Sequence, residues 1–189
     1  MPSLSSAAIM VRDAVDADLP AIQAIYAHYV LHELATFELE PSDTAAMAAR
    51  RASVLAAGLP WLVAEYEGEI VGYCYATPYR PRPAYRYTIE ESIYLAAGRG
   101  GLGLGSLLMR ALLERCARGP WRQMLAVIAM PDMDGNAASL ALHRRFCFEH
   151  AGVFSKVGHK HGQWIDTVLM QRPLGIGAGA PPDDAVRKA

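Results

Sequence analysis

The chain has 189 residues, of which 52% are hydrophobic and 20% are charged, and its formal net charge is −1. This length and composition predict one globular domain, and the near-neutral charge argues against nucleic acid or an anionic membrane as the main partner. No apolar run reaches the roughly 18 residues that a membrane span needs, and the first ten residues lack the features of a secretory signal.

The first part of the chain is predicted to form a strand, two helices and a β-hairpin. These elements cover residues 9–12, 16–34, 44–58 and 61–79. Apolar residues recur at helical spacing in the first helix, and the second ends at Gly58. Asp16 or Asp18 is a candidate cap for the first helix, and Ser42 or Asp43 for the second. Two runs rich in β-forming residues are joined at Glu67-Gly68, which is typical of a hairpin turn.

The rest of the chain alternates strands with helices and closes on a second hairpin. The predicted elements are a strand at 88–95, a glycine turn at 97–106, a helix that begins near Gly103, a strand at 122–130, a turn at 131–136, a helix at 136–148 and two strands within 149–174 around Gly162. This order predicts an α/β or α+β layer fold, with a mixed sheet and helices on both faces. We expect residues 1–174 to form the domain and the tail at 175–189, rich in Gly, Ala and Pro, to be disordered.

The cysteines and two histidines indicate neither disulfides nor a metal. Cys74, Cys116 and Cys147 are an odd number of thiols with no Cys-x-x-Cys pair. We interpret them as reduced and mostly buried, in a cytoplasmic protein. His28 and His32 have a spacing that could bind a metal, but no third ligand accompanies them, so we expect no metal site.

The segment "AGRGGLGLGS" at 97–106 places five glycines between a strand and a helix. Free N–H groups at a helix N-terminus favour an anion, so the pattern is typical of a pyrophosphate cradle. Gly98 to Gly103 fits the dinucleotide motif by letters, but no acidic residue ends a second parallel strand about 20 residues later. No Lys-Ser or Lys-Thr pair follows, which excludes a Walker motif. The phosphate loop of an acyl-CoA acyltransferase and a flexible turn remain as alternatives.

The stretch "IYLAAGRGGLGLGSLL" resembles the signature of the GNAT superfamily of N-acetyltransferases. In that family a Gln/Arg-x-x-Gly-x-Gly/Ala loop binds the pyrophosphate of acetyl-CoA. Aligned on Gly103 and Gly105, its first position is Gly100 here, and Arg99 lies one residue too early. The segments "AYRYTIEESIYL" and "VGHKHGQWIDTVLMQ" narrow the resemblance to the phosphinothricin and methionine sulfoximine acetyltransferases. The resemblance covers about residues 9–174 and implies a splayed mixed sheet and a homodimer.

The resemblance also implies which residues contact acetyl-CoA. The backbone of Ile93, Tyr94 and Leu95 would hydrogen-bond the pantetheine arm and help to polarise the thioester carbonyl. The other expected contacts come from the glycine loop and the helix at 136–148, and they are Gly101, Leu102, Gly103, Leu104, Gly105, Ser106, Asn136 and Ser139.

Glu90 and Glu91 lie in the middle of a strand, where carboxylates are uncommon. Strand alternation predicts that Glu90 shares a face with Ser92 and Tyr94, and that Glu91 lies on the opposite face. Acylating an amine needs a base, because an ammonium has no lone pair, and a carboxylate in a cleft could take the proton. Either glutamate could instead face solvent or pair with an arginine. The resemblance selects Glu90 as the base.

Asn136, Ser139 and His143 share one face of the helix at 136–148 by their spacing. The face predicted to be buried carries Ala138, Ala141, Leu142 and Phe146. The resemblance places a histidine where many relatives use a tyrosine to protonate the departing thiolate. His143 is therefore a candidate acid, and a partly exposed helix histidine is the alternative.

Arg80, Arg82 and Arg86 cluster just before the strand at 88–95. Arginine binds carboxylate or phosphinate bidentately, although a solvated basic loop is an equal alternative. The resemblance assigns Tyr85 and Arg86 to the acceptor pocket, and Phe37 is a candidate for its apolar wall. The expected substrate-binding residues are Phe37, Arg82, Tyr85 and Arg86.

These observations predict an acetyl-CoA-dependent N-acetyltransferase acting on the α-amino group of a small amino-acid analogue. Attack would be direct, because no cysteine is placed to form an acyl-enzyme. The alternatives are a GNAT enzyme for another small amine and a CoA-binding regulatory module without catalysis. We expect no metal, nucleic acid or membrane partner.

Overall fold

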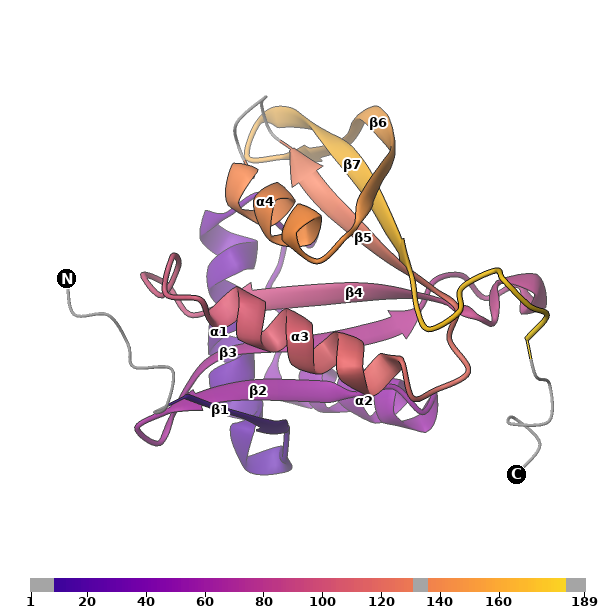
Figure 1. Ribbon diagram of the computed structural model, residues 1–189. Coiled ribbons are helices and arrows are strands. Elements are labelled where there is room, and N and C mark those ends of the chain that lie inside the picture. Colours follow the sequence, from indigo (N-terminus) through magenta and orange to yellow (C-terminus); the bar gives the residue numbers. More distant parts are fainter. Residues whose placement is uncertain (1–8, 131–135, 183–189) are drawn as a thin grey trace.

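The computed structural model describes residues 9–130 and 136–182. These residues form one seven-stranded sheet and four α-helices (Figure 1). The strands are β1 (Ile9–Asp13), β2 (Trp61–Tyr66), β3 (Glu69–Pro78), β4 (Thr88–Leu95), β5 (Gln123–Met130), β6 (Glu149–Lys160) and β7 (Gln163–Pro173). The helices are α1 (Leu19–His32), α2 (Thr44–Ala56), α3 (Leu104–Cys116) and α4 (Ala137–Arg145). The strand order in the sheet is β1-β2-β3-β4-β5-β7-β6.

The sheet is antiparallel except at the contact between β4 and β5. These two strands run parallel, and they pair only through residues 88–90 of β4 and 123–125 of β5. Beyond these pairs the strands diverge, so the sheet opens into a V (Figure 1). The predicted mixed, splayed sheet is therefore confirmed, and the opening leaves one edge of β4 without a neighbouring strand.

Helices cover both faces of the sheet, as predicted. α1 and α2 pack behind β2, β3 and β4, whereas α3 crosses the front of β1 to β4 and α4 packs on β5 (Figure 1). α3 buries the stripe that its sequence spacing predicts, since Leu104, Leu108, Leu112 and Cys116 are each at most 1% exposed. This packing fixes the start of α3, and the glycine loop before it, against the end of β4.

Local signals set several of the element boundaries. Asp43 caps α2 as predicted, because its carboxylate accepts a hydrogen bond of 2.7 Å from the N–H of Ala46. The first hairpin turns at Glu67 and Gly68, whose φ angles are 51° and 81°. The second hairpin turns beside Gly162, with φ 78°. Glycine adopts such left-handed angles without strain, which is why turns of this kind contain it.

Two segments lie at the limits of the described chain. The turn expected at 131–136 falls almost wholly outside the described residues. Of the tail expected at 175–189, residues 175–182 are described, and the N–H of Gly177 bonds to the carbonyl of buried Leu174 at 2.9 Å. The disordered tail stays a prediction. No helix in the described segments is long and apolar enough to cross a membrane.

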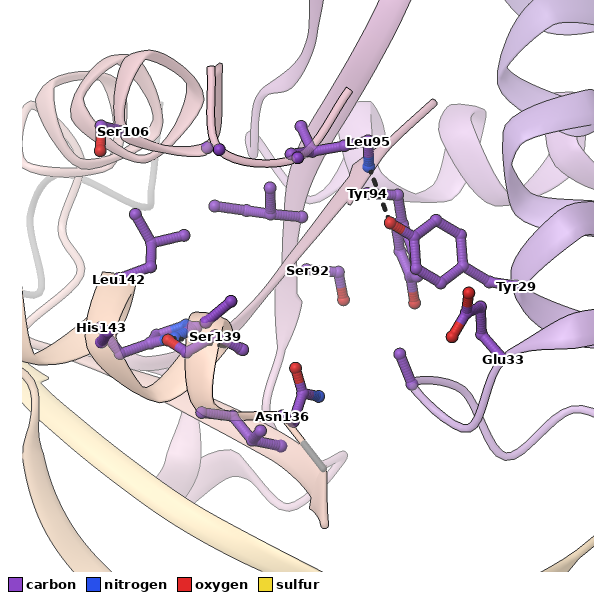
Figure 2. Close-up of a pocket in the computed structure, with 18 of the residues that line it drawn as sticks. Tyr29, Glu33, Ser92, Tyr94, Leu95, Ser106, Asn136, Ser139, Leu142 and His143 are labelled. Atoms are coloured by element: carbon purple, nitrogen blue, oxygen red, sulfur yellow. Dashed lines mark hydrogen bonds between the residues drawn. The ribbon is translucent and has the colours of Figure 1, made fainter. Parts of the chain in front are cut away.

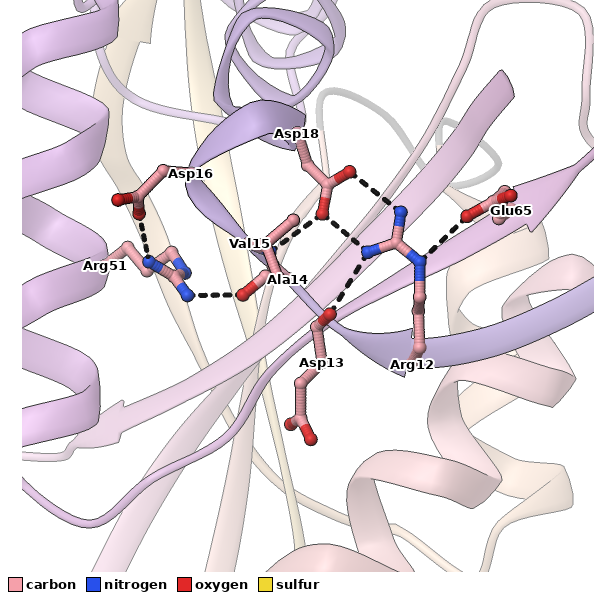
Figure 3. Close-up of polar contacts among 8 residues, drawn as sticks. All are labelled: Arg12, Asp13, Ala14, Val15, Asp16, Asp18, Arg51 and Glu65. Carbon is pink, nitrogen blue, oxygen red and sulfur yellow. Dashed lines mark hydrogen bonds and ion pairs between the residues drawn. The ribbon is translucent and has the colours of Figure 1, made fainter. Parts of the chain in front are cut away.

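The start of α1 differs from the prediction. A 3₁₀ turn occupies Asp16–Asp18, so α1 starts only after Asp18, and the Asp18 carboxylate does not cap it. Asp18 instead accepts two hydrogen bonds from Arg12, at 2.7 and 2.9 Å, and one of 2.8 Å from the N–H of Val15 (Figure 3). Arg12 also donates to Glu65 of β2 at 2.8 Å. This cluster fastens β1, β2 and the start of α1 together.

Replacing Asp18 by asparagine is expected to lower the free energy of unfolding by about 1–3 kcal/mol, because the half-buried Arg12 guanidinium loses the charge of its buried partner and keeps only that of Glu65. Urea denaturation at pH 7 measures the loss. The Arg12 hydrogen bonds lower the pKa of Asp18, so its contribution is full above the ordinary carboxylate pKa and is lost as pH falls through the lowered value. The matched control is Asp16→Asn, at an exposed ion pair with Arg51. Equal losses from both substitutions would contradict the prediction.

Candidate active site

A cleft of about 580 Å³ lies where β4 and β5 separate. Its walls come from the end of α1, the second half of β4, the glycine loop, β5 and α4. Figure 2 shows Ser92 and Tyr94 on β4 between Tyr29 of α1 on one side and Ser139 of α4 on the other. A volume of this size suits a small-molecule ligand, so the divergence of two strands creates the main candidate site.

The free edge of β4 presents backbone hydrogen-bonding groups to this cleft. The N–H of Ala96 bonds to the carbonyl of Val71 on β3, whereas the N–H of Leu95 bonds to the hydroxyl of Tyr29 at 3.2 Å (Figure 2). Backbone groups along a strand alternate in direction, so Ile93 directs its N–H to the same side as Leu95. This edge could pair with an extended ligand that carries amide groups.

The glycine loop forms the other end of the cleft. Gly98, Gly101 and Gly103 have φ angles of 73°, 76° and 81°, and Gly103 is the N-cap of α3. A Cβ atom at Gly103 would meet no atom within 4 Å, so the space above the loop is open. An open turn of left-handed glycines at a helix N-terminus is suited to an anion such as pyrophosphate.

Most of the predicted cofactor contacts line this cleft. They are Ile93, Tyr94, Leu95, Gly101, Gly103, Gly105, Ser106, Asn136 and Ser139. Asn136 is held in place by a hydrogen bond of 3.2 Å from its side-chain amide to the carbonyl of Ala129 on β5. Leu102 and Leu104 do not line the cleft, because their apolar side chains pack with the core, so each can contribute only through its backbone.

His143 is buried, contrary to the predicted orientation of α4. It is 3% exposed, whereas Ala138 and Ala141, expected on the buried face, are exposed and line the cleft. α4 turns this way because the His143 ring is held between the Glu91 carboxylate, at 2.7 Å, and the ring of Phe148. The apolar spacing of the sequence did not indicate this, because a polar side chain buries well when it has a charged partner.

Glu90 and Glu91 lie on opposite faces of β4, as predicted. Glu91 reaches α4, while Glu90 shares the α1 face with Ser92 and Tyr94. Glu90 is half-buried and is not among the residues that line the cleft, although Ser92 and Tyr94 are. Burial, with help from the charge of Glu91, raises the pKa of Glu90, and Arg80 opposes the shift. The Glu90 carboxylate therefore lies beside the closed end of the V.

The predicted acceptor residues are less closely grouped. Tyr85 lines a second cavity of about 270 Å³ with Tyr79, on the same face of the sheet as Glu90. Phe37 is 41% exposed and packs on Gly158 of the closing hairpin. Arg82 and Arg86 line neither cavity, and the Arg86 guanidinium lies 4.6 Å from the ring of Tyr87.

Sequence reasoning missed three residues near the site. Tyr29 and Glu33 enter the cleft from the end of α1, and Arg145 of α4 lies 3.5 Å from the Ser106 hydroxyl at the start of α3. Arg80, which the sequence did group with Arg82 and Arg86, opposes the rise in the pKa of Glu90. Tyr29 and Glu33 lie in an ordinary helix pattern, so nothing local marked them. Arg145 follows His143 by two positions. Its positive charge close to a candidate site residue was the one signal in the sequence that could have indicated it.

The cysteines do not line the cleft. Cys74 and Cys116 are buried, and burial raises the pKa of both thiols, that of Cys116 to about 12. The expectation of mostly buried thiols therefore holds for these two cysteines, whereas Cys147 is exposed. No group of three His, Cys, Asp or Glu side chains in the described segments could hold a metal ion.

Comparison with known proteins agrees with this architecture. The model of the Acetyltransferase (GNAT) family matches residues 25–148. A phosphinothricin N-acetyltransferase of Alcaligenes faecalis is 52% identical over 95% of this chain and 90% of that protein. An L-methionine sulfoximine/L-methionine sulfone acetyltransferase of Pseudomonas aeruginosa is 40% identical over 90% of this chain and 98% of that protein. The structure of a GNAT superfamily phosphinothricin acetyltransferase from Sinorhizobium meliloti in complex with AcCoA is similar with a TM-score of 0.90, at 42% identity over 96% of both chains.

Proposed function

Because the chain belongs to the GNAT family of acetyltransferases, with acetyl-CoA as co-substrate, we propose that it acetylates the α-amino group of a small amino-acid analogue. The acceptors that we propose are phosphinothricin, methionine sulfoximine and methionine sulfone, which the names of its relatives mention. The observation that supports this most is the cleft between β4 and β5, which runs from the glycine loop to the neighbourhood of Glu90. Its free strand edge and open anion cradle fit an extended thioester that carries a pyrophosphate.

We propose Glu90 as the group that takes the proton of the acceptor ammonium, directly or through one water. Burial raises the pKa of Glu90, which makes its carboxylate a better base, and the charge of Arg80 opposes the rise. Acetyl-CoA supplies the activated acetyl group, and the N–H groups along β4 beside Ile93 would polarise its carbonyl. Direct transfer without an acyl-enzyme is supported by the position of the thiols outside the cleft.

The acceptor is tested by measuring thiol release from acetyl-CoA. We expect rapid release with phosphinothricin, methionine sulfoximine and methionine sulfone, and slow release with the common amino acids. The carboxylate and the phosphinate or sulfoximine group would be bound by arginines near Tyr85, with Arg82 and Arg86 as candidates and Phe37 as the apolar wall. A faster rate with another small amine would replace the proposed acceptor and keep the enzyme class.

Replacing Gly103 by valine is expected to raise the KM for acetyl-CoA by about tenfold or more, because a branched side chain would stand where the backbone receives an anion. Steady-state kinetics with varied acetyl-CoA measure this. Gly68→Val is the matched control, since Gly68 has the same φ of 81° and an equally open surrounding but lies in the β2–β3 turn. If both variants change KM equally, backbone strain rather than loss of the cradle explains the effect.

We also expect a homodimer in the cytoplasm. The exposed apolar side chains of the closing hairpin, Val153, Phe154, Val157 and Trp164, supply a surface that a second copy could cover. Sedimentation at micromolar concentration is expected to show twice the chain mass of 20.5 kDa. A clean monomer at that concentration would remove the dimer from the proposal.

A further inference from the structure

Glu91 and His143 form a buried pair that joins β4 to α4. The Glu91 Oε1 atom lies 2.7 Å from His143 Nε2, and their side chains are 5% and 4% exposed. The other ring nitrogen, Nδ1, lies 2.7 Å from the backbone carbonyl of Ser139. Both residues also line the cleft, so the pair belongs to its wall.

These partners determine where the protons of the pair lie. A carbonyl oxygen only accepts, so the contact with Ser139 requires a proton on Nδ1 of His143. The contact between Nε2 and the Glu91 carboxylate then holds one more proton. Without that proton, two lone pairs would face each other at 2.7 Å around a buried negative charge. That proton can lie on Nε2 or on the Glu91 carboxyl, and the raised pKa of His143 favours Nε2, which gives an imidazolium beside a carboxylate with both ring N–H groups occupied.

The surroundings leave His143 as the counter-charge of Glu91. Oε2 of Glu91 is buried and has no hydrogen-bond partner among the described residues. The nearby thiols of Cys74 on β3 and Cys116 on α3 are uncharged at neutral pH, because burial raises the pKa of both. Burial alone would lower the pKa of His143, but its bonds to Glu91 and Ser139 outweigh burial and raise it.

Other charged groups near the pair lie farther out. Glu90 is next in sequence, on the opposite face of β4. Arg172 of β7 lies 5.9 Å from the ring of Phe148, whose edge touches the His143 ring. Arg172 therefore meets an aromatic ring rather than the carboxylate, and it does not replace His143 as the partner of Glu91.

We propose that Glu91 is a positioning residue, which keeps His143 doubly protonated and bound to β4. In this state His143 holds α4 in place as a wall of the cleft. It delivers no proton to the departing sulfur. This inference rests on the proposed function. Donation from Nε2 would leave the Glu91 carboxylate buried without a counter-charge, which is strongly unfavourable. Glu91 therefore acts on the reaction through the position of Ser139 and Leu142, which line the cleft on α4 (Figure 2).

The proton balance of acetyl transfer closes without His143. The acceptor ammonium loses two protons as the N–C bond of the amide forms and the C–S bond breaks. One proton ends on the sulfur of CoA and the other in solvent. In the proposal both travel through Glu90 or water, and the pair has the same protons before and after turnover.

The first test is ¹⁵N NMR of the protein labelled in its histidine rings, between pH 6 and 9. We expect both ring nitrogens of His143 to remain protonated across this range. In Glu91→Gln, Nε2 is expected to lose its proton near the ordinary histidine pKa of about 6.5, while Glu91→Asp, which keeps the charge, retains it. A singly protonated His143 in the unaltered protein at pH 7.5 would overturn the proposal, and so would an unchanged Glu91→Gln spectrum.

The second test separates binding from turnover. For Glu91→Gln and His143→Gln we expect the Kd for acetyl-CoA, measured by calorimetry, to rise about tenfold. Their kcat at saturating acetyl-CoA is expected to stay within about threefold, whereas loss of a general acid would lower kcat by about 10²–10⁴-fold. A fall in kcat of that size in folded His143→Gln would overturn the proposal. Glu114→Gln, on the exposed face of α3, is the control for removing one charge.

The NMR and calorimetry need no acceptor. They therefore stand apart from the proposed function, which fails if none of the named acceptors releases thiol. Thermal unfolding of each variant shows whether it is folded. If Glu91→Gln does not fold, Glu91→Asp supplies a variant with little change in shape.

Discussion

Replacing Glu90 by glutamine is expected to lower kcat by about 10²–10⁴-fold, the usual contribution of a general base. Glutamine keeps the size and the half-buried position of Glu90 but cannot take a proton. The KM for acetyl-CoA is expected to change little, because Glu90 does not line the cleft. Initial rates with saturating acceptor and acetyl-CoA measure the loss.

The pH profile of the same variant distinguishes proton transfer from a general loss of charge. Burial raises the pKa of Glu90, so kcat of the unaltered enzyme is expected to fall at a pH above that of an ordinary glutamate. Glu90→Gln is expected to lack the fall in kcat that comes from protonation of Glu90. Its rate is instead expected to rise toward alkaline pH, where the acceptor amine loses its proton without help from a base. Glu114→Gln removes a charge far from the cleft and should leave the profile unchanged.

Glu91→Gln is a control for Glu90→Gln in kcat at saturating acetyl-CoA, but not in acetyl-CoA binding. Alternation predicted correctly that the two carboxylates face opposite sides of β4, but it gave no partner for Glu91. The structure places Glu91 against His143, which is 52 positions later in the chain. Equal, small losses of kcat from Glu90→Gln and Glu91→Gln would contradict the Glu90 mechanism.

The elements that the sequence predicted well are those set by local patterns. The buried stripe of α3 follows from apolar spacing, the Asp43 cap from its place before a helix, and the first hairpin from Glu67-Gly68. Each depends on residues within a few positions of one another, so tertiary packing had little to override.

The features that the sequence left out depend on contacts between distant segments. The opening between β4 and β5 was expected only from the family resemblance, because the sequence of one strand does not determine which strand it pairs with. Tyr29 reaches the N–H of Leu95 across 66 positions, and its helix pattern looked like any other. Asp18, a candidate cap for the first helix, is buried and bonds to Arg12, which also pairs with Glu65 of β2.

Lys160 shows how the closing hairpin supports the cleft. It ends β6 and is 2% exposed, and burial lowers its pKa. Its Nζ atom donates to the backbone carbonyls of Tyr29, Glu33 and Thr36, at 3.2, 2.8 and 2.9 Å. An ammonium has three N–H groups, and each finds one acceptor. These carbonyls belong to the last turn of α1 and the loop after it, the segment that brings Tyr29 and Glu33 into the cleft.

Replacing Lys160 by methionine is expected to lower the free energy of unfolding by about 3 kcal/mol, because carbonyls buried around Nζ lose their donor while the apolar length is kept. For a domain of this size that corresponds to a fall in Tm of about 6–12 °C, measured by calorimetry. Lys156→Met is the matched control, since Lys156 lies on the same strand but is exposed. Equal shifts from both substitutions would contradict the role of the carbonyl cage. If the cage fails locally instead of globally, Lys160→Met is expected to keep its Tm and to raise the KM for acetyl-CoA, because Tyr29 and Glu33 would no longer be held at the cleft wall.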